Sequence, residues 1–213
     1  MKRNKTYIAA VLAAVAFVIF WSPWSTDHSG WSAEEKTIIE QSDSVMRVLT
    51  VDADSTFLRA PSSDLSAEEL KSLQLETLMR KMLRTVTDPS QDGVGIAAPQ
   101  VGIHRRLVCV QRFDKEGEPF ECYPNIHIEE LNGEVKCGPE GCLSVPGKRG
   151  MVPRYEGVCI SYVSPLTGEK VNERIEGFTA VIFQHECDHL DGILYTDRAD
   201  SVYDTKKLST DNE

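Results

Sequence analysis

The strongest constraint on the fold of this chain is the heptapeptide QHECDHL at residues 184–190. In an α-helix, His185 and His189 lie one above the other on one face, and Glu186 lies about 100° around the axis from His185. Both imidazoles can then hold one metal ion while the carboxylate acts on a water molecule beside it. The segment therefore predicts a helix built around a hydrolytic metal site. The alternative is an amphipathic helix with two half-buried histidines.

A third protein ligand would decide between these two interpretations. In zinc proteases with a His-Glu-x-x-His pattern the third ligand follows the second histidine, but this chain has no later His and no later Glu except its last residue. The ligand is therefore expected upstream, and cysteine is the candidate. Cys187 points about 200° away from His185 and is expected to be a small packed residue. Cys142 lies in PEGCLSVPG, residues 139–147, where glycines and prolines favour a tight loop that can present a thiolate.

A further segment, GVGIAAPQVG at residues 93–102, combines alternate glycines with two alanines and a glutamine. Such residues let the backbone approach another group closely, and Gln100 supplies an amide donor. Together the segments resemble the three signature motifs of the peptide deformylase family: Gly-x-Gly-x-Ala-Ala-x-Gln at 93–100, Glu-Gly-Cys-Leu-Ser at 140–144 and Gln-His-Glu-x-Asp-His-Leu at 184–190. The motifs occur in family order, and the resemblance extends over roughly residues 44–200.

The resemblance implies a metal-dependent hydrolase that removes the formyl group from N-formyl-methionyl peptides or nascent chains and releases formate. One divalent ion is expected as the cofactor, ferrous iron or alternatively zinc, with the protein ligands Cys142, His185 and His189. Glu186 is expected to act as general base and then to protonate the leaving amine. From the family, the Gln100 side chain and the Leu143 backbone N–H are expected to meet the developing oxyanion.

A methionine substrate also requires an apolar pocket beside the metal. The residues three, four and seven positions before His185 share its helix face, and they are Ile182, Val181 and Phe178. With Val94 they are expected to line this pocket, as the corresponding family positions do, although each also suits a core. The resemblance implies that Gly95 is a backbone contact to the formyl group or peptide.

Around these motifs the sequence predicts an α+β fold in which antiparallel sheets pack around a central metal-binding helix. Apolar residues at 75, 78, 79, 82, 83 and 86 follow a capping box at 66–69, which predicts a helix that ends before Asp88. Strands are expected at residues 106–111, 126–130, 157–162 and 170–175, with turns at 115–117, 132–133 and 165–168. The metal helix is expected over residues 179–190. Arg154 is a further candidate for peptide contact, and Asp188 is expected to form a structural ion pair.

The N-terminal region departs from this single-domain pattern. Basic residues at positions 2, 3 and 5 precede an apolar run over 7–21, which predicts a signal peptide or membrane anchor in residues 1–24. No Ala-x-Ala cleavage pattern follows, which favours an anchor, and the basic flank would place the catalytic domain across the membrane. Residues 25–43 are expected to form a polar linker, residues 44–200 the catalytic domain and residues 201–213 a polar tail. The expected localisation is membrane-bound or exported in a bacterial cell, or cytoplasmic if the N-terminal segment is not used.

Charge and cysteine content restrict the partners of this chain. A formal net charge of −10 argues against a broad phosphate-binding surface, so direct nucleic-acid binding is not expected. The six cysteines do not settle the compartment, because their spacings suggest no disulfide framework. Two other functions stay open: a membrane-anchored zinc endoprotease, which lacks its downstream ligand, and a non-enzymatic structural metal module, which lacks a fourth ligand at a suitable spacing.

Overall fold

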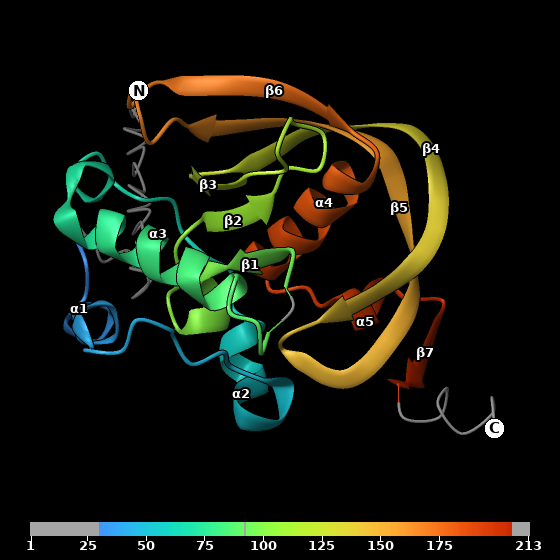
Figure 1. Cartoon of the computed structure of the whole chain (residues 1–213), viewed down its shortest axis with the longest axis horizontal. Coiled ribbons are helices and arrows are strands. Elements are labelled where there is room, and N and C mark those ends of the chain that lie inside the picture. Colours follow the sequence, from blue (N-terminus) through green and yellow to red (C-terminus); the bar gives the residue numbers. More distant parts are fainter. Residues whose placement is uncertain (1–29, 92, 206–213) are drawn as a thin grey trace, which may run out of the picture.

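The computed structural model describes residues 30–91 and 93–205. Within them, strands form two antiparallel sheets around one helix, α4 (Phe178–Leu190). Apolar residues of α4 such as Ala180, Phe183 and Leu190 are fully buried against residues of both sheets. Figure 1 shows α4 enclosed between the sheets at the centre of the molecule. The expected α+β fold, with antiparallel sheets around the metal-binding helix, is confirmed.

The smaller sheet is a meander of short strands. Its order is β1 (Gly95–Ala97), β2 (Leu107–Gln111) and β3 (Phe120–Pro124), with antiparallel pairing throughout. The apolar run of β2 is buried because the strand lies in the middle of this sheet. The 3-10 helix η2 (Ala98–Val101) follows β1 directly and carries Gln100.

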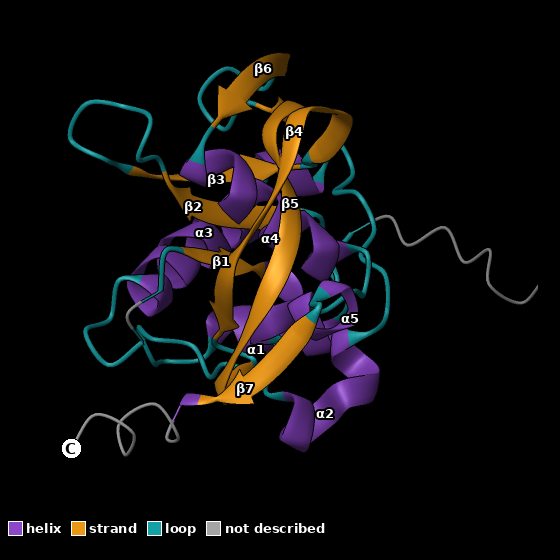
Figure 2. Cartoon of the chain, turned by 90° about the vertical axis from the view of Figure 1, so that its right-hand side faces the viewer, coloured by secondary structure: helices purple, strands orange, loops and turns teal. Residues whose placement is uncertain are grey.

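The larger sheet is dominated by a long hairpin, which Figure 2 shows as two extended neighbouring strands. Its strands are β4 (His127–Cys142), β5 (Val145–Val163) and β6 (Lys170–Glu176), and β7 (Ser201–Asp204) pairs with β5. Strands expected at 126–130 and 157–162 are therefore only parts of longer strands. The expected turn at 132–133 is wrong, since Gly133, with φ +81°, lies at a register shift inside β4. A positive φ at such a bulge suits glycine.

The expected helix after residue 66 begins later than its capping box suggests. Ser66 and Glu69 do form the reciprocal hydrogen bonds of a capping box, but they stabilise a short 3-10 helix, η1 (Glu69–Lys71). Ser72 then caps α3 (Leu73–Val86), which buries one apolar face as its spacing predicts. Two capped segments in succession therefore replace a single longer helix.

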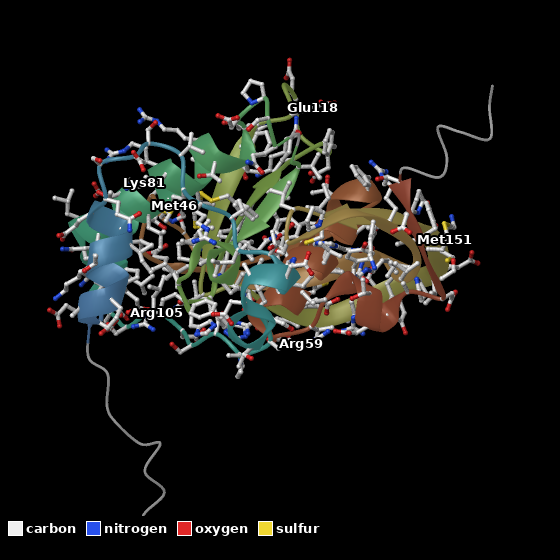
Figure 3. All side chains as sticks on the ribbon, turned by 90° about the horizontal axis from the view of Figure 1, so that it is seen from below. Met46, Arg59, Lys81, Arg105, Glu118 and Met151 are labelled. Carbon is white, nitrogen blue, oxygen red and sulfur yellow. A yellow bond between two sulfur atoms is a disulfide. The ribbon has the colours of Figure 1, made fainter. Side chains whose placement is uncertain are left out.

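A docked helix occupies part of the range expected to be a polar linker. This helix, α1 (Ala33–Glu40), precedes α2 (Val51–Leu58), and Arg105 contacts its Glu35 at 3.0 Å and Glu69 at 3.0 Å. Figure 3 labels Arg105 at the foot of α1. Residues 33–40 are thus attached to the body of the protein through the buried ion pair between Glu35 and Arg105. At the other end, residues 201–204 of the expected polar tail form β7.

The expected signal peptide or anchor in residues 1–24 lies outside the described residues. Within residues 30–91 and 93–205, no helix has both the length and the apolar character needed to cross a membrane.

Candidate metal centre and substrate cleft

Three potential metal ligands from two elements converge where β4 ends beside α4. Cys142 is the last residue of β4, and the rings of His185 and His189 on α4 have centroids 5.2 Å apart. Their ligand atoms all lie within 4.8 Å of one another, and Cys142 Sγ is 3.1 Å from His189 Nε2. Burial opposes ionisation of Cys142, yet the two neighbouring imidazoles hold the pKa of its thiol well below the ordinary value. A thiolate and two imidazoles at these distances fit one divalent ion.

A buried carboxylate orients the first histidine. His185 Nδ1 lies 2.8 Å from Glu140 Oε2 and donates to it, which leaves Nε2 for a metal. Arg154 holds the other side of Glu140, with Nε donating to Oε1 at 2.7 Å. Although burial opposes it, the hydrogen bonds from His185 and Arg154 lower the pKa of Glu140 to about 2. Glu140 therefore stays ionised and fixes the ring of His185.

Glu186 is the buried acid–base candidate of the site. Its side chain is close to Gly95, where a Cβ would come within 2.5 Å of Glu186 Oε1, so glycine is required there. Glu186 Oε2 has no hydrogen-bond partner within residues 30–91 and 93–205, and the residue is 4% exposed. Burial raises the pKa of Glu186 to about 7. A carboxylate with this pKa can accept and return a proton near neutral pH.

The two expected oxyanion donors lie beside the ligands. Gln100 Oε1 accepts from the Ala97 N–H at 2.8 Å, which fixes the amide so that Nε2 lies 3.2 Å from Ser144 Oγ and 3.6 Å from Cys142 Sγ. Leu143 follows Cys142 in the turn between β4 and β5. Gln100 is therefore hydrogen-bonded to the potential metal ligand Cys142, and Leu143 is the next residue in the chain.

One cleft of about 510 Å³ brings nearly all of the expected site residues together. The expected residues that line it are Val94, Gly95, Gln100, Cys142, Leu143, Phe178, Val181, Ile182, His185 and Glu186. His189 is buried behind this surface. Val94, Phe178, Val181 and Ile182 supply apolar side chains to this lining, and Gln100, His185 and Glu186 supply polar ones, which suits a substrate with an apolar side chain next to a reactive polar group.

Arg154 is not placed as a peptide contact. Its guanidinium is buried between Glu140 and Asp188, with Nη1 2.6 Å from Asp188 Oδ2. Arg198 of the short helix α5 (Tyr195–Arg198) also donates to Asp188 at 2.6 Å. Asp188 thus forms the structural ion pairs expected of it. Sequence reasoning missed Glu140, although it precedes Cys142 by two residues and alternate strand residues share a face.

The structure also contains a disulfide that sequence reasoning did not anticipate. Cys109 of β2 and Cys122 of β3 are directly opposite and bonded to each other. The signal was present, because the predicted turn at 115–117 lies midway between the two positions. Cys187, by contrast, lies in the core, where burial raises the pKa of its thiol.

The fold and the site together define a class of protein. A helix with a His-Glu-x-x-His motif, a cysteine ligand from a neighbouring strand and a buried glutamate in an open cleft are the parts of a metal-dependent hydrolase.

Comparisons with known proteins identify the family within this class. The polypeptide deformylase family model matches residues 45–204. A peptide deformylase of Symbiobacterium thermophilum is 40% identical over 158 residues, covering 73% of this chain and 70% of the relative. Peptide deformylase 2 of Pseudomonas putida is 43% identical over 135 residues, covering 61% and 74%. The chain belongs to the peptide deformylase family.

Solved structures agree with this assignment. A class I type b peptide deformylase from Acinetobacter baumannii with Met-Ala-Ser bound has a TM-score of 0.65 and 39% identity, covering 72% of this chain and 98% of that one. A peptide deformylase from Synechococcus elongatus in complex with actinonin has a TM-score of 0.65 and 33% identity, covering 76% and 84%.

Proposed function

We propose that this chain is a peptide deformylase, which hydrolyses the amide bond between a formyl group and the N-terminal methionine of a peptide. The products are formate and a free amino terminus. Family membership supports this activity, and so does the site. The observation that carries it is a buried Glu186 with one oxygen that has no partner in the described part of the chain, in a cleft beside the potential ligands Cys142, His185 and His189.

The residues divide the reaction between them. A divalent ion held by Cys142, His185 and His189 would supply Lewis-acid polarisation of the formyl group and of water. Glu186 accepts a proton from the attacking water as the water oxygen adds to the formyl carbon. Glu186 then gives this proton to the nitrogen as the C–N bond breaks. The Gln100 amide and the Leu143 N–H donate to the oxyanion that develops between these steps.

The apolar residues of the cleft, Val94, Phe178, Val181 and Ile182, would bind the methionine side chain. Gly95 also lines the cleft and would contact the substrate through its backbone, while its missing Cβ leaves room for Glu186. Placing the formyl group at the ligand end puts the side chain along α4 toward Phe178.

The two alternative functions lack support. The relatives and solved structures reported above are named as peptide deformylases, and the third potential ligand, Cys142, lies upstream of the two histidines instead of following His189. A closed structural metal site would need a fourth protein ligand, whereas the group in the described part of the chain consists of Cys142, His185 and His189.

Formate release from formyl-Met-Ala-Ser by protein loaded with metal under anaerobic conditions tests the proposed activity. Acetyl-Met-Ala-Ser serves as the matched control, because it has the same peptide and a blocked amine without the formyl group. We expect formate from the first peptide and no free amine from the second. Failure to release formate from the first peptide by fully metal-loaded protein would contradict the assignment.

We propose ferrous iron as the working ion and zinc as an alternative. The thiolate and imidazole donors accept either metal, so the donor set alone does not rank them. Turnover is expected to be faster with iron than with zinc in the same apoprotein, and to fall on exposure to air only in the iron form. Equal rates for the two forms would contradict this choice.

We also propose that the catalytic domain lies outside the cytoplasm, attached by an N-terminal anchor. The basic residues before the apolar run in the sequence support this orientation, and the Cys109–Cys122 disulfide is of a kind that is rare in a reducing cytosol. The substrates would then be formylated peptides that have been released or translocated.

A reporter fused after residue 40 tests the orientation, and membrane fractionation tests the anchor. We expect reporter activity only outside the cytoplasm and full-length enzyme in the membrane pellet. Soluble, cytoplasmic, full-length protein would contradict both proposals.

A further inference from the structure

An aromatic pair at the rim of the cleft joins the substrate pocket to the hairpin β2–β3. Phe113 follows β2, and its ring lies 5.2 Å from the ring of Phe178, with a tilt of 49° between their planes. Phe178 is the first residue of α4 and lines the cleft, while Phe113 lies in the loop between β2 and β3. The position of one cleft wall therefore depends on a contact from outside the helix.

Phe178 needs this contact more than its neighbours in the cleft. It is the first residue of α4, directly after Gly177, and 57% of its surface is exposed. Ile182, one turn further along, is buried in the core between α4 and the sheets. An exposed aromatic ring at a helix end can change rotamer unless a neighbour restrains it.

Phe113 is itself held in a fixed place. The preceding residue, Arg112, is 1% exposed and donates to Asp114 at 2.7 and 2.8 Å and to Glu173 of β6 at 2.6 and 3.2 Å. Its backbone N–H donates to the Pro119 carbonyl at 2.8 Å, which closes the base of the loop. Phe113 thus lies between two members of an ion-pair cluster.

Beyond Lys115, which pairs with Glu121 at 2.7 Å, the loop extends into solvent. Glu118, labelled in Figure 3, lies at the tip of the hairpin and points into solvent. The Cys109–Cys122 disulfide joins β2 to β3 a few residues before and after this loop. The two strands that carry the loop are therefore covalently linked.

The distance along α4 indicates which part of a substrate would reach Phe178. Phe178 lies seven residues before His185, roughly 10 Å along the helix at 1.5 Å per residue. An unbranched side chain that extends from a formyl group near His185 would approach Phe178 with its far end. A methyl side chain would not reach it.

We propose that Phe113 is a positioning residue for substrate specificity: by holding the ring of Phe178, it sets the outer wall of the pocket for the methionine side chain. This inference rests on the proposed deformylase function. Phe113 takes part in no chemical step, so its loss should change KM and the preference for the N-terminal residue of the peptide, and leave kcat unchanged.

Steady-state kinetics of Phe113→Ala with formyl-Met-Ala-Ser and formyl-Ala-Ala-Ser test the proposal. KM for the methionine peptide should rise about three- to tenfold, the range expected for loss of one aromatic contact in an apolar pocket. Its kcat, and KM for the alanine peptide, should stay within about twofold of the wild type. Phe113→Tyr keeps the ring and should restore the wild-type KM. Glu116→Ala, at the exposed loop tip, should leave both peptides unaffected.

The outcomes separate this inference from the assigned activity. Wild-type enzyme that releases no formate would contradict the deformylase function. Active wild type combined with an unchanged KM in Phe113→Ala, or with an equal rise for both peptides, would overturn the role of Phe113. A lower melting temperature with unchanged peptide preference would likewise show that Phe113 is only structural.

Discussion

Two buried arginines, Arg154 and Arg112, each hold two carboxylates near the substrate cleft. Arg154 binds Glu140 and Asp188, whose side chains are 8% and 9% exposed. Arg112 binds Asp114 and Glu173, whose side chains are 29% and 25% exposed. The first cluster ends on the potential metal ligand His185, and the second flanks Phe113 at the rim of the pocket.

The difference in exposure of these carboxylates shows that buried arginine–carboxylate clusters can have two separate roles. Removing one partner of a fully buried pair leaves an uncompensated charge, whereas partly exposed carboxylates can turn to water. The Arg154 cluster should therefore tolerate few substitutions, and substitutions in it should lower metal affinity and turnover. The Arg112 cluster should tolerate more change and act on substrate affinity.

The largest effect is expected at Glu186, which follows His185, the potential metal ligand that the Arg154 cluster orients. Glu186→Gln keeps the shape of the side chain but removes the proton acceptor, so kcat should fall by about two to four orders of magnitude with unchanged metal content. Formate release and metal analysis on the same preparation measure both. A variant that keeps more than roughly a tenth of the wild-type kcat would show that Glu186 is not the base.

Next in size is the loss of the cysteine ligand. Cys142→Ser should lose bound metal on dialysis, because a hydroxyl ionises far less readily than a thiol and is a weaker ligand. Cys187→Ala is the matched control, since that thiol is buried in the core, and it should retain the metal. The opposite result in the two variants would mean that the ligand set is wrong.

The comparison between the clusters is tested directly by one carboxylate from each. Glu140→Gln should weaken metal binding about 10- to 100-fold, the range for a lost partner of a metal-bound histidine. Glu173→Gln removes a carboxylate from Arg112 and should leave metal affinity unchanged. Competition with a chelator measures both affinities. Equal losses of metal affinity in the two variants would show that the Arg154 and Arg112 clusters do not have different roles.

The smallest expected effect is a pH dependence of the folding stability that comes from Asp114 in the Arg112 cluster. Hydrogen bonds from Arg112 lower the pKa of Asp114 from 3.8 to about 2 in the folded protein. The unfolded state therefore binds this proton first, so the stabilisation is complete above about pH 4 and is lost as pH falls toward 2. Urea unfolding of metal-free wild type and Asp114→Asn should give a stability difference that shrinks over this window. A constant difference across it would contradict the assigned pKa.

The sequence was sufficient for the parts of the site that lie within a single motif. Helical spacing placed His185 and His189 correctly relative to each other, and the alternate glycines correctly indicated close approach at Gly95, where a Cβ would meet Glu186. The α+β class followed from the same patterns. These features depend on neighbouring residues and on regular geometry, which a sequence displays.

Features that depend on long-range register could not be read in this way. Glu140 and His185 are 45 residues apart, and their contact requires β4 to continue through a bulge at Gly133, where the sequence predicts a turn. The approach of Phe113 to Phe178 likewise joins a loop to a helix from another part of the chain. The burial of Arg154 could not be predicted from the sequence, because its partners Glu140 and Asp188 lie on two other segments.

The position of the disulfide has a consequence for how the chain can mature. Cys109 and Cys122 are 13 residues apart in one hairpin, whereas Cys142 meets His189 across 47 residues. Closing a short loop is faster than forming a distant contact, so the hairpin cysteines can be oxidised before α4 has joined the sheets. Once they are paired, neither of them is a free thiol that an oxidant could join to Cys142 in a new disulfide. In an oxidising environment, the hairpin disulfide would thus remove two of the thiols that could pair wrongly with the cysteine needed at the metal site.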